Sequence, residues 1–210
     1  MTLRSLSRVV AGLCTVAALG QSAGAAEPVT VIVGKRAPQL EQFAARELAA
    51  QFRRLFGSKV TVTSAPPDDK SQRVVVGSAK TNAVVRGALA GRELSAQGIV
   101  LKSATTNGRR TLYVAGGSPK ATLWAVYELG YRFGIRYLLR EDIYPNTPIP
   151  LKLDGIDVAI EPQFRTRTWR TVNDFAIGPE SWPLADHKRI LRQLAKMKFN
   201  RVMISVYPWH

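Results

Sequence analysis

The chain has 210 residues, a formal net charge of +15 and a single cysteine. Typical domains contain about 100 to 150 residues, so this length is enough for one domain and part of a second. A single cysteine cannot form a disulfide bond within the chain, and stability therefore has to come from burial of a core.

The positive charge could attract polyanions, but the basic residues are scattered along the sequence. We find no aromatic-interleaved basic patch and no known nucleic-acid motif, so nucleic acid is not an expected partner. Two interpretations stay open, namely a solvated basic surface that aids solubility and attraction to an acidic sugar polymer.

Residues 1–26 have the pattern of a secretory signal peptide. Arg4 and Arg8 precede an apolar stretch at 9–19, and small residues at Ala23 and Ala25 follow, so cleavage is expected near residue 25 or 26. A bilayer span needs about 20 apolar residues, so this pattern predicts export, to the periplasm or the extracellular space, without a membrane anchor.

The leader also contains Cys14, which raises the alternative of lipoprotein processing. Leu13 stands directly before it, where that processing requires a small residue, and we therefore favour cleavage. Removal of Arg4 and Arg8 takes the formal net charge from +15 to +13. The mature chain then has no thiol to act as a nucleophile or metal ligand.

The first mature elements alternate between strand and helix patterns. "VTVIVG" predicts a strand that glycine ends, and residues 38–56 predict a helix with Pro38 in its first turn and Gly57 at its end. One stripe of this helix is apolar and should face a core: Leu40, Ala44, Leu48, Phe52 and Leu55. "KVTVTS" and "RVVVGS" predict two further strands.

A hairpin and a second helix follow. "GIVLKS" and "RTLYVAGG" should pair across Asn107-Gly108, which is a strong hairpin signal. The next helix should begin at Ser118, with Pro119 in its first turn, and should end at Gly134. "GGSPK" lacks the spacing of nucleotide-binding loops, so we interpret it as a helix start. The side chains predicted to face inward are Leu123, Val126, Tyr127 and Phe133.

These elements predict an α+β domain at 27–150, with a small, partly antiparallel sheet and two helices packed on it. A proline-rich linker should occupy 151–163. Residues 164–210 then predict a strand, a long loop, a helix and a parallel strand. The helix "HKRILRQLAKMK" should turn inward the residues Ile190, Leu191, Leu194 and Met197.

A barrel of eight strand-helix units takes ~250 residues, and only about 47 remain from residue 164 onward. We therefore expect this part to be the first β-α-β unit of an incomplete, truncated (β/α)8 barrel. The strand composition of Val202, Ile204 and Val206 supports this, because such β-branched runs pack on both faces in parallel sheets.

The order of these parts resembles a known group of enzymes. The relevant segments are "AARELAAQFRRLFG", "RVVVGS", "GIVLKS", "LYVAGGSPKATLWAVYELGYRFGIRYL", "EPQFRTR" and "LAKMKFNRVMIS". Together they resemble the non-catalytic N-terminal domain of bacterial α-glucuronidases and β-N-acetylhexosaminidases, joined to the start of the TIM-barrel glycosidase domain. The resemblance implies a hexosaminidase domain-2-like fold, a carbohydrate substrate and catalytic carboxylates on later barrel strands.

The resemblance also implies sugar-binding positions in the last unit. The arginine that grips sugar hydroxyls in hexosaminidases matches either Arg167 or Arg170, and the α-glucuronidase pattern matches Asn173 and Trp182. In the hexosaminidase pattern a His-rich strand follows, but here only His210 lies near its end, and this departure speaks against an N-acetylhexosamine substrate.

Residue chemistry adds to these candidates. A guanidinium suits sugar hydroxyls or a uronate carboxylate, although a place at the domain junction is an equal alternative for Arg167 and Arg170. Trp182 and Trp209 could stack on a sugar ring, and Trp169 less so. The pairs Glu141-Asp142 and Asp68-Asp69 are expected to be solvated loop acids, so we name no catalytic residue. His187 and His210 form no metal set, and neither a metal nor a cofactor is predicted.

The leading hypothesis is thus the N-terminal part of an exported glycoside hydrolase. Two alternatives stay open. One is a non-catalytic carbohydrate-binding or structural module that shares the domain. The other is an exported basic protein that binds polyanions by charge alone.

Overall fold

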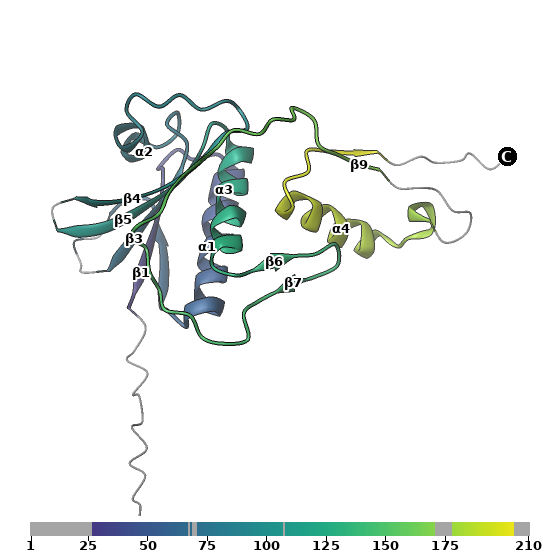
Figure 1. Ribbon diagram of the computed structural model, residues 1–210, viewed down its shortest axis with the longest axis horizontal. Helices are drawn as coiled ribbons and strands as arrows, with labels where there is room; N and C mark the ends of the chain where they lie inside the picture. The colour runs from purple at the N-terminus through teal and green to yellow at the C-terminus, as the bar shows by residue number, and fades with distance from the viewer. Residues whose placement is uncertain (1–26, 67, 69–70, 107, 171–177, 204–210) are drawn as a thin grey trace, which may run out of the picture.

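A computed structural model gives the fold, and it describes residues 27–66, 68, 71–106, 108–170 and 178–203. A six-stranded sheet forms the centre of residues 27–160, which we call the first region (Figure 1). Its strands are β1 (Val29–Val33), β2 (Val60–Thr63), β3 (Gln72–Gly77), β4 (Ile99–Thr106), β5 (Arg109–Gly116) and β8 (Asp157–Ile160).

The sheet is mixed, with strand order β2-β1-β3-β5-β4-β8. The first four strands in this order are parallel, whereas β4 pairs antiparallel with both β5 and β8. The predicted hairpin is confirmed, because Thr106 of β4 pairs with Arg109 of β5 and Gly108 has a φ of 71°. A positive φ of this kind is one that glycine adopts without a steric penalty. Asn107 lies outside the described residues.

Helix α1 (Gln39–Phe56) packs on one face of the sheet and ends, as expected, at a left-handed Gly57. The predicted apolar stripe holds for Ala44, Leu48 and Phe52, which are fully buried, but Leu40 is exposed. The buried stripe is shifted around the helix, because the first turn buries the carboxyl side chain of Glu41 instead.

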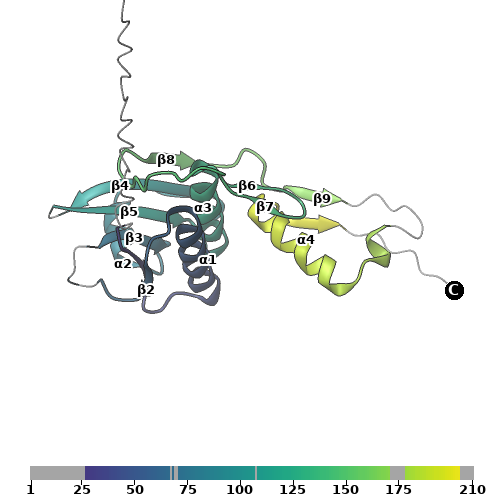
Figure 2. The same cartoon turned by 90° about the horizontal axis from the view of Figure 1, so that it is seen from below.

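Helix α3 (Pro119–Arg132) lies beside α1 on the same face and completes the main core. Its start is confirmed, since the Ser118 hydroxyl accepts a hydrogen bond from the Ala121 amide at 3.2 Å. Leu123, Val126 and Tyr127 are buried as predicted. Figures 1 and 2 show α1 and α3 as one helical layer between the sheet and the C-terminal elements.

The opposite face of the sheet carries a short helix that the sequence did not reveal, α2 (Ala83–Ala88). Val85 and Leu89 pack there against Ile32 and Val75, which point away from the main core. The first region therefore has three layers, with α1 and α3 on one face and α2 on the other.

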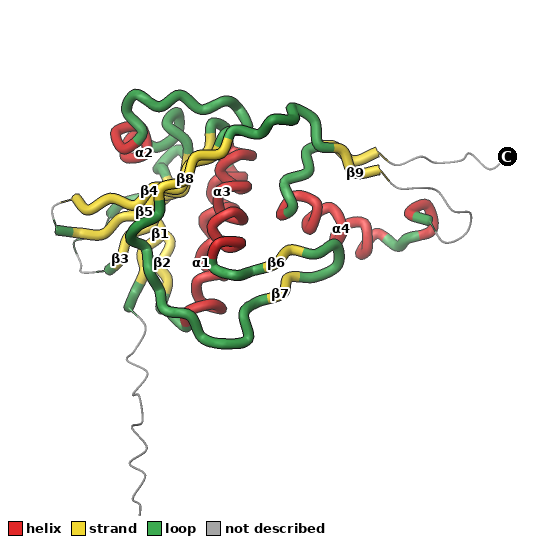
Figure 3. The backbone as a smooth tube through the Cα atoms, viewed as in Figure 1, coloured by secondary structure: helices red, strands yellow, loops and turns green. Residues whose placement is uncertain are grey.

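The stretch 151–163, which we expected to be a linker, contains the strand β8. Val158 of β8 pairs with Leu101 of β4 and packs against the main core. Strand β8 lies along β4 at the edge of the sheet, as Figure 3 shows. Its exposed and half-buried residues alternate over only four positions, which is too short a pattern to recognise in the sequence.

A β-hairpin and a strand-helix-strand unit complete the described chain. The hairpin is formed by β6 (Arg136–Tyr137) and β7 (Asp142–Ile143). The unit consists of β9 (Thr168–Arg170), the 3-10 turn η1 (Pro179–Ser181), α4 (Leu184–Lys196) and β10 (Arg201–Met203).

Strands β9 and β10 are parallel, as predicted for a β-α-β unit. Ile190 and Leu194 of α4 are buried, but Leu191 is exposed, contrary to the prediction. Val202 is half-buried in β10, whereas Ile204 and Val206 lie outside the described residues. None of the helices in the described ranges has the length and apolar composition that crossing a membrane requires.

Candidate carbohydrate-binding site

The carboxyl ends of β9 and β10 form the edge at which a ligand site is expected. In parallel sheets and barrels, ligands bind at the carboxyl ends of the strands, where the connections to the helices begin. Arg170 is the last residue of β9 and its side chain is exposed. Trp182 follows η1 in the connection from β9 to α4, and it is half-buried.

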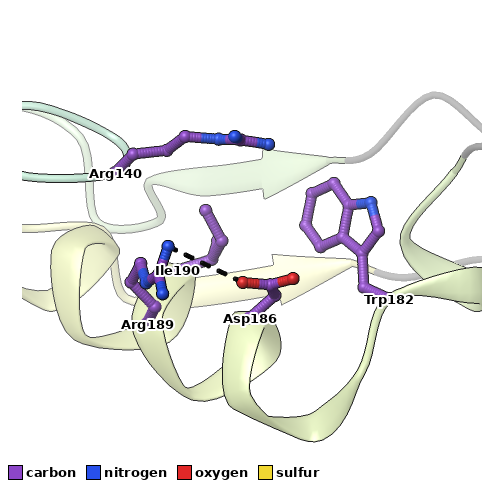
Figure 4. A pocket seen from close by; sticks show the side chains of 5 residues that line it. All are labelled: Arg140, Trp182, Asp186, Arg189 and Ile190. Carbon is purple, nitrogen blue, oxygen red and sulfur yellow. Dashed lines mark ion pairs between the residues drawn. The ribbon is translucent and has the colours of Figure 1, made fainter.

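Trp182 lines a small pocket between the two regions of the molecule (Figure 4). Arg140, in the β6–β7 turn of the first region, lies on the side opposite the indole, and the start of α4 closes the base. Asp186 and Arg189 form an exposed ion pair there at 3.8 Å. The pocket encloses about 70 Å³. Ligand pockets usually have about 300 to 1,000 Å³, so this one could hold part of a sugar but not a whole ring.

The chemistry of this pocket suits an acidic sugar. The indole of Trp182 offers an apolar face, on which the C–H face of a sugar ring can pack. The guanidinium of Arg140 carries donors that fit a carboxylate. The His187 ring lies 5.9 Å from the indole, measured between ring centroids, but it is not among the residues that line the pocket.

Arg167 lies at the other end of β9, in the junction between the two regions. Its Nε donates a hydrogen bond to the Lys198 carbonyl at 2.7 Å, and its Nη1 donates one to the Phe164 carbonyl at 2.9 Å. The guanidinium carbon lies 4.8 Å from the centroid of the Trp124 ring. Burial lowers the pKa of Arg167, but a guanidinium stays protonated in proteins. These contacts favour the junction role for Arg167, and a sugar contact stays a prediction for Arg170.

The junction contains further polar contacts that fix the second unit to the first region. The Glu128 carboxylate on α3 accepts from Arg132 at 3.0 Å and from Lys198 at 2.9 Å. Lys198 has a φ of 66°, a conformation unusual for a residue with a Cβ, and it follows the end of α4. The ion pair of its ammonium and the Arg167 bond to its carbonyl hold it in place.

Asn200 links the two regions on the β9 side. Its Oδ1 accepts from the Arg167 amide at 2.8 Å, and its Nδ2 donates to Gln97 Oε1 at 3.1 Å and to the Arg165 carbonyl at 2.9 Å. Gln97 in turn donates to the same carbonyl at 2.7 Å. A loop of the first region is therefore hydrogen-bonded to both chain segments that lead into β9 and β10.

Asp142 was expected to be a solvated loop acid, and this prediction is wrong. It lies in β7, where its carboxylate pairs with Lys196 of α4 and accepts a hydrogen bond from Gln193 Nε2 at 3.0 Å. Gln193 is buried and also donates to the Leu138 carbonyl at 2.7 Å. The β6–β7 hairpin therefore holds α4 through specific polar contacts.

The other candidates give a mixed outcome. Asn173, Trp209 and His210 lie outside the described residues, and their sugar contacts stay predictions. Trp169 is half-buried within β9. Sequence reasoning missed Arg140, because nothing in the local pattern indicates that a turn 42 positions before Trp182 lies across from it. Within the ranges that the structure describes, no group of three or more His, Cys, Asp or Glu side chains could hold a metal ion.

A comparison with protein families identifies the family to which the first region is similar. Residues 16–129 match the family described as "Glycosyl hydrolase family 67 N-terminus", and this match covers more than half of the chain. The chain belongs to this family. The family 67 match confirms the resemblance inferred from the sequence. No curated protein matches the chain.

Solved structures support the same fold for this family 67 N-terminal chain. It superposes with a TM-score of 0.65 and 15% identity on BtGH115A, a GH115 4-O-methyl-α-glucuronidase with specificity for decorated arabinogalactans, covering 86% of this chain and 25% of that one. For an N-acetyl-β-hexosaminidase of Streptomyces plicatus the TM-score is 0.51 at 16% identity, with 86% of this chain and 32% of that one covered. The chain thus spans about a quarter to a third of these structures.

Proposed function

We propose that the chain forms the N-terminal part of an exported glycoside hydrolase that acts on oligo- or polysaccharides, with an α-glucuronidase-like or a β-N-acetylhexosaminidase-like activity. The observation that carries the proposal is the family match over 16–129, joined to a β-α-β unit that the first region holds in place. We infer that this unit is the first of a (β/α)8 barrel.

The first region would then act as a rigid support for the barrel. Asp142, Glu128 and Gln97 hold α4 and the segments before β9 and β10, so the carboxyl ends of these strands keep a fixed direction. Positioning of this kind matters, because a displacement of about 1 Å at a catalytic site can lower a rate by about 100-fold.

The catalytic carboxyl groups would lie outside this chain. Glycosidases place two of them about 5 to 9.5 Å apart, one protonated and one ionised. Several acids of the described residues already have structural partners. Glu128 and Asp142 bind basic residues, and Glu41 is buried beneath Thr81. We therefore propose that the chain orients substrate and that strands supplied elsewhere in the natural protein perform the hydrolysis.

Of the two substrate classes, we favour acidic sugars. The reason is the pocket in which Arg140 faces Trp182, because a guanidinium beside an indole face matches a uronate ring with its carboxylate. Export is supported by the leader pattern alone, and N-terminal sequencing of the exported protein, with a first residue near position 26 or 27, is its check.

The test of the proposed function compares the natural protein with the 210-residue chain on uronate-bearing and N-acetylhexosamine-bearing oligosaccharides. We expect the natural protein to release a monosaccharide and the chain alone to hydrolyse neither these nor aryl glycosides. Turnover by the chain alone would contradict our placement of the carboxyl groups, and a natural protein without glycosidase activity would refute the proposal.

Trp182→Ala in the natural protein sharpens this test. Loss of one stacking partner is worth about 0.5 to 1.5 kcal/mol, so KM for the uronate substrate should rise roughly 2- to 10-fold. Phe43→Ala, at an exposed aromatic residue on α1, is the matched control and should leave KM unchanged. An equal effect of both substitutions would place the substrate away from Trp182.

A further inference from the structure

The parallel part of the sheet contains a point at which two connections leave on opposite faces. After β1 the chain passes to α1, whose buried residues share a core with Val31 and Val33. After β3 it passes to α2, which packs with Ile32 and Val75 on the other face. Strands β1 and β3 are neighbours and parallel. Such a switch point leaves a crevice outside the carboxyl ends of the two strands, and it is where open α/β sheets bind ligands.

A crevice is present at this position and has the size of a ligand site. It encloses about 480 Å³, within the range of about 300 to 1,000 Å³ that is typical of ligand pockets. The loop after β1, residues 34–36, forms one wall, and residues 80–84 with Arg86, which follow β3, form the other. Ser64 and Pro66, after β2, extend the rim.

The charge of the crevice is positive. Lys35 and Arg36 come from one wall, and Lys80 and Arg86 from the other, and all four side chains are exposed. None of the described residues that line it is acidic. Arg86 is fixed in direction, because its Nε donates to the Ala79 carbonyl at 2.8 Å. Cations from two loops that face one hollow attract an anionic group more strongly than the same charges spread over a surface.

Hydrogen bonds to α1 and to β3 fix the loop after β3. Thr81 Oγ1 donates to Glu41 Oε2 at 2.6 Å and accepts from the Ser78 amide at 3.2 Å. Asn82 is buried, and its Nδ2 donates to the Val76 carbonyl at 3.3 Å. Burial raises the pKa of Glu41, and the Thr81 bond opposes this rise. The Glu41 carboxyl lies beneath Thr81 and is not among the residues that line the hollow.

The two walls also touch each other at the base. A Cβ added to Gly34 would lie 2.4 Å from the Thr81 carbonyl oxygen, so only glycine permits this approach of the two backbones. A preformed crevice of this kind loses little entropy on binding, because its loops are already ordered.

We propose that this crevice is a second binding site for a small anionic saccharide, which it would hold by a carboxylate or a phosphate ester. Arginine donors suit a carboxylate in bidentate fashion, and lysine acts as a point charge for either group. Ser64 supplies a hydroxyl group for the sugar ring. The site lies at the edge of the first region and is separate from the Trp182 pocket, which has no lining residue in common with it.

The test uses the 210-residue chain and isothermal titration calorimetry at low and moderate salt. The probes are a glucuronic-acid-bearing xylotriose, its carboxyl-reduced neutral counterpart, glucose 6-phosphate and inorganic phosphate. The double variant Lys35→Glu/Lys80→Glu reverses one charge on each wall. The matched control, Arg46→Glu/Arg110→Glu, changes the net charge equally at two exposed residues outside the crevice.

We expect at least one acidic saccharide to bind, and the crevice variant to bind it at least about tenfold more weakly than either the wild type or the control. Tighter binding of the uronate probe identifies a carboxylate site, and tighter binding of the phosphate probe identifies a phosphate ester site. Equal weakening by both double variants, equal binding of the neutral probe, or binding of inorganic phosphate alone would overturn the proposal.

The choice of a saccharide as the occupant rests on the proposed function, but the two proposals can fail separately. Hydrolysis of a short aryl glycoside by the natural protein should be unaffected by Lys35→Glu/Lys80→Glu, because that substrate does not extend to the crevice. Loss of saccharide binding with intact hydrolysis therefore supports the second site, and loss of both would mean that the crevice belongs to the catalytic machinery.

Discussion

The two regions of this molecule are stabilised in different ways. In residues 27–160, the sheet and the helices α1 and α3 enclose a core in which many side chains are fully buried. The unit from β9 to β10 buries Ile190 and Leu194 but leaves Leu184 67% and Leu191 48% exposed. It is attached to the first region mainly through polar groups, among them Gln193 and Lys198.

This difference has an energetic consequence. Burying one large apolar side chain stabilises a fold by about 1.5 to 3 kcal/mol, whereas a hydrogen bond contributes about 0.5 to 1.5 kcal/mol. The first region should therefore keep its structure without the second, but the second should open more readily than the first. The exposed apolar side chains around α4 are the surface that further barrel units would cover, in keeping with the proposed function.

The largest effect should come from the core of the first region. Phe52 is fully buried, and its ring meets those of Phe56 and Phe133 edge to face, with centroids 5.2 and 5.8 Å away. Phe52→Ala removes these contacts and leaves a cavity, so the free energy of unfolding should fall by about 3 to 5 kcal/mol. Urea denaturation measures this loss.

Phe43→Ala on the same helix is the control, because Phe43 is 38% exposed. Its effect should be well under that of Phe52→Ala. If the two substitutions destabilise the protein equally, the core we describe does not carry the stability of the first region.

A smaller effect should follow from breaking the attachment of α4. Gln193→Ala removes the donor to the Leu138 carbonyl and to the Asp142 carboxylate. Because one of these two hydrogen bonds is to a charged group, the cost should be about 1 to 3 kcal/mol. We expect the amide hydrogens of α4 to exchange faster, by the factor in the opening equilibrium that this loss of free energy produces. The amides of α1 and α3 should stay protected. Arg192→Ala, at an exposed neighbour, should change neither. Faster exchange in all three helices would show that the two regions unfold as one.

Much of the first region could be predicted from its sequence, because its signals are local. The β-branched runs of β1 and β3, the caps at Ser118 and Gly57, and the Asn-Gly turn each act within a few residues. Helix α2 was missed because only Val85 of its six residues is buried, which gives no helical periodicity.

The candidate site was less accessible to this reasoning, because its geometry depends on packing between distant segments. Trp182 was recognisable as a stacking residue, but its partner Arg140 lies in the other region. Arg167 and Arg170 were equivalent in the sequence. The structure separates them only because Trp124 and the Lys198 carbonyl happen to lie at the end of β9 that Arg167 occupies.

The smallest effect concerns the buried carboxyl of Glu41, which the first region contains and which has no counterpart among the described residues of the second. Burial raises its pKa in the folded state, although hydrogen bonds from Thr81 and Ser78 oppose the rise. Between its unfolded pKa, about 4.3, and its raised folded pKa, the folded protein holds more protons than the unfolded chain. By linkage, the stability that Glu41 contributes is complete below the unfolded pKa and declines as the pH rises through the folded pKa.

Glu41→Gln abolishes this titration and keeps an oxygen that can accept the hydrogen bond from the Thr81 hydroxyl. The variant should therefore gain stability relative to the wild type as the pH rises from 4 to 8, and urea denaturation at a series of pH values measures the difference. Glu141→Gln, at an exposed acid, controls for the change in net charge. If the difference in free energy of unfolding between wild type and Glu41→Gln stays constant over this range, the Glu41 carboxyl is no more difficult to ionise in the folded protein than in the unfolded chain. The space between β3 and α1 would then be open to water.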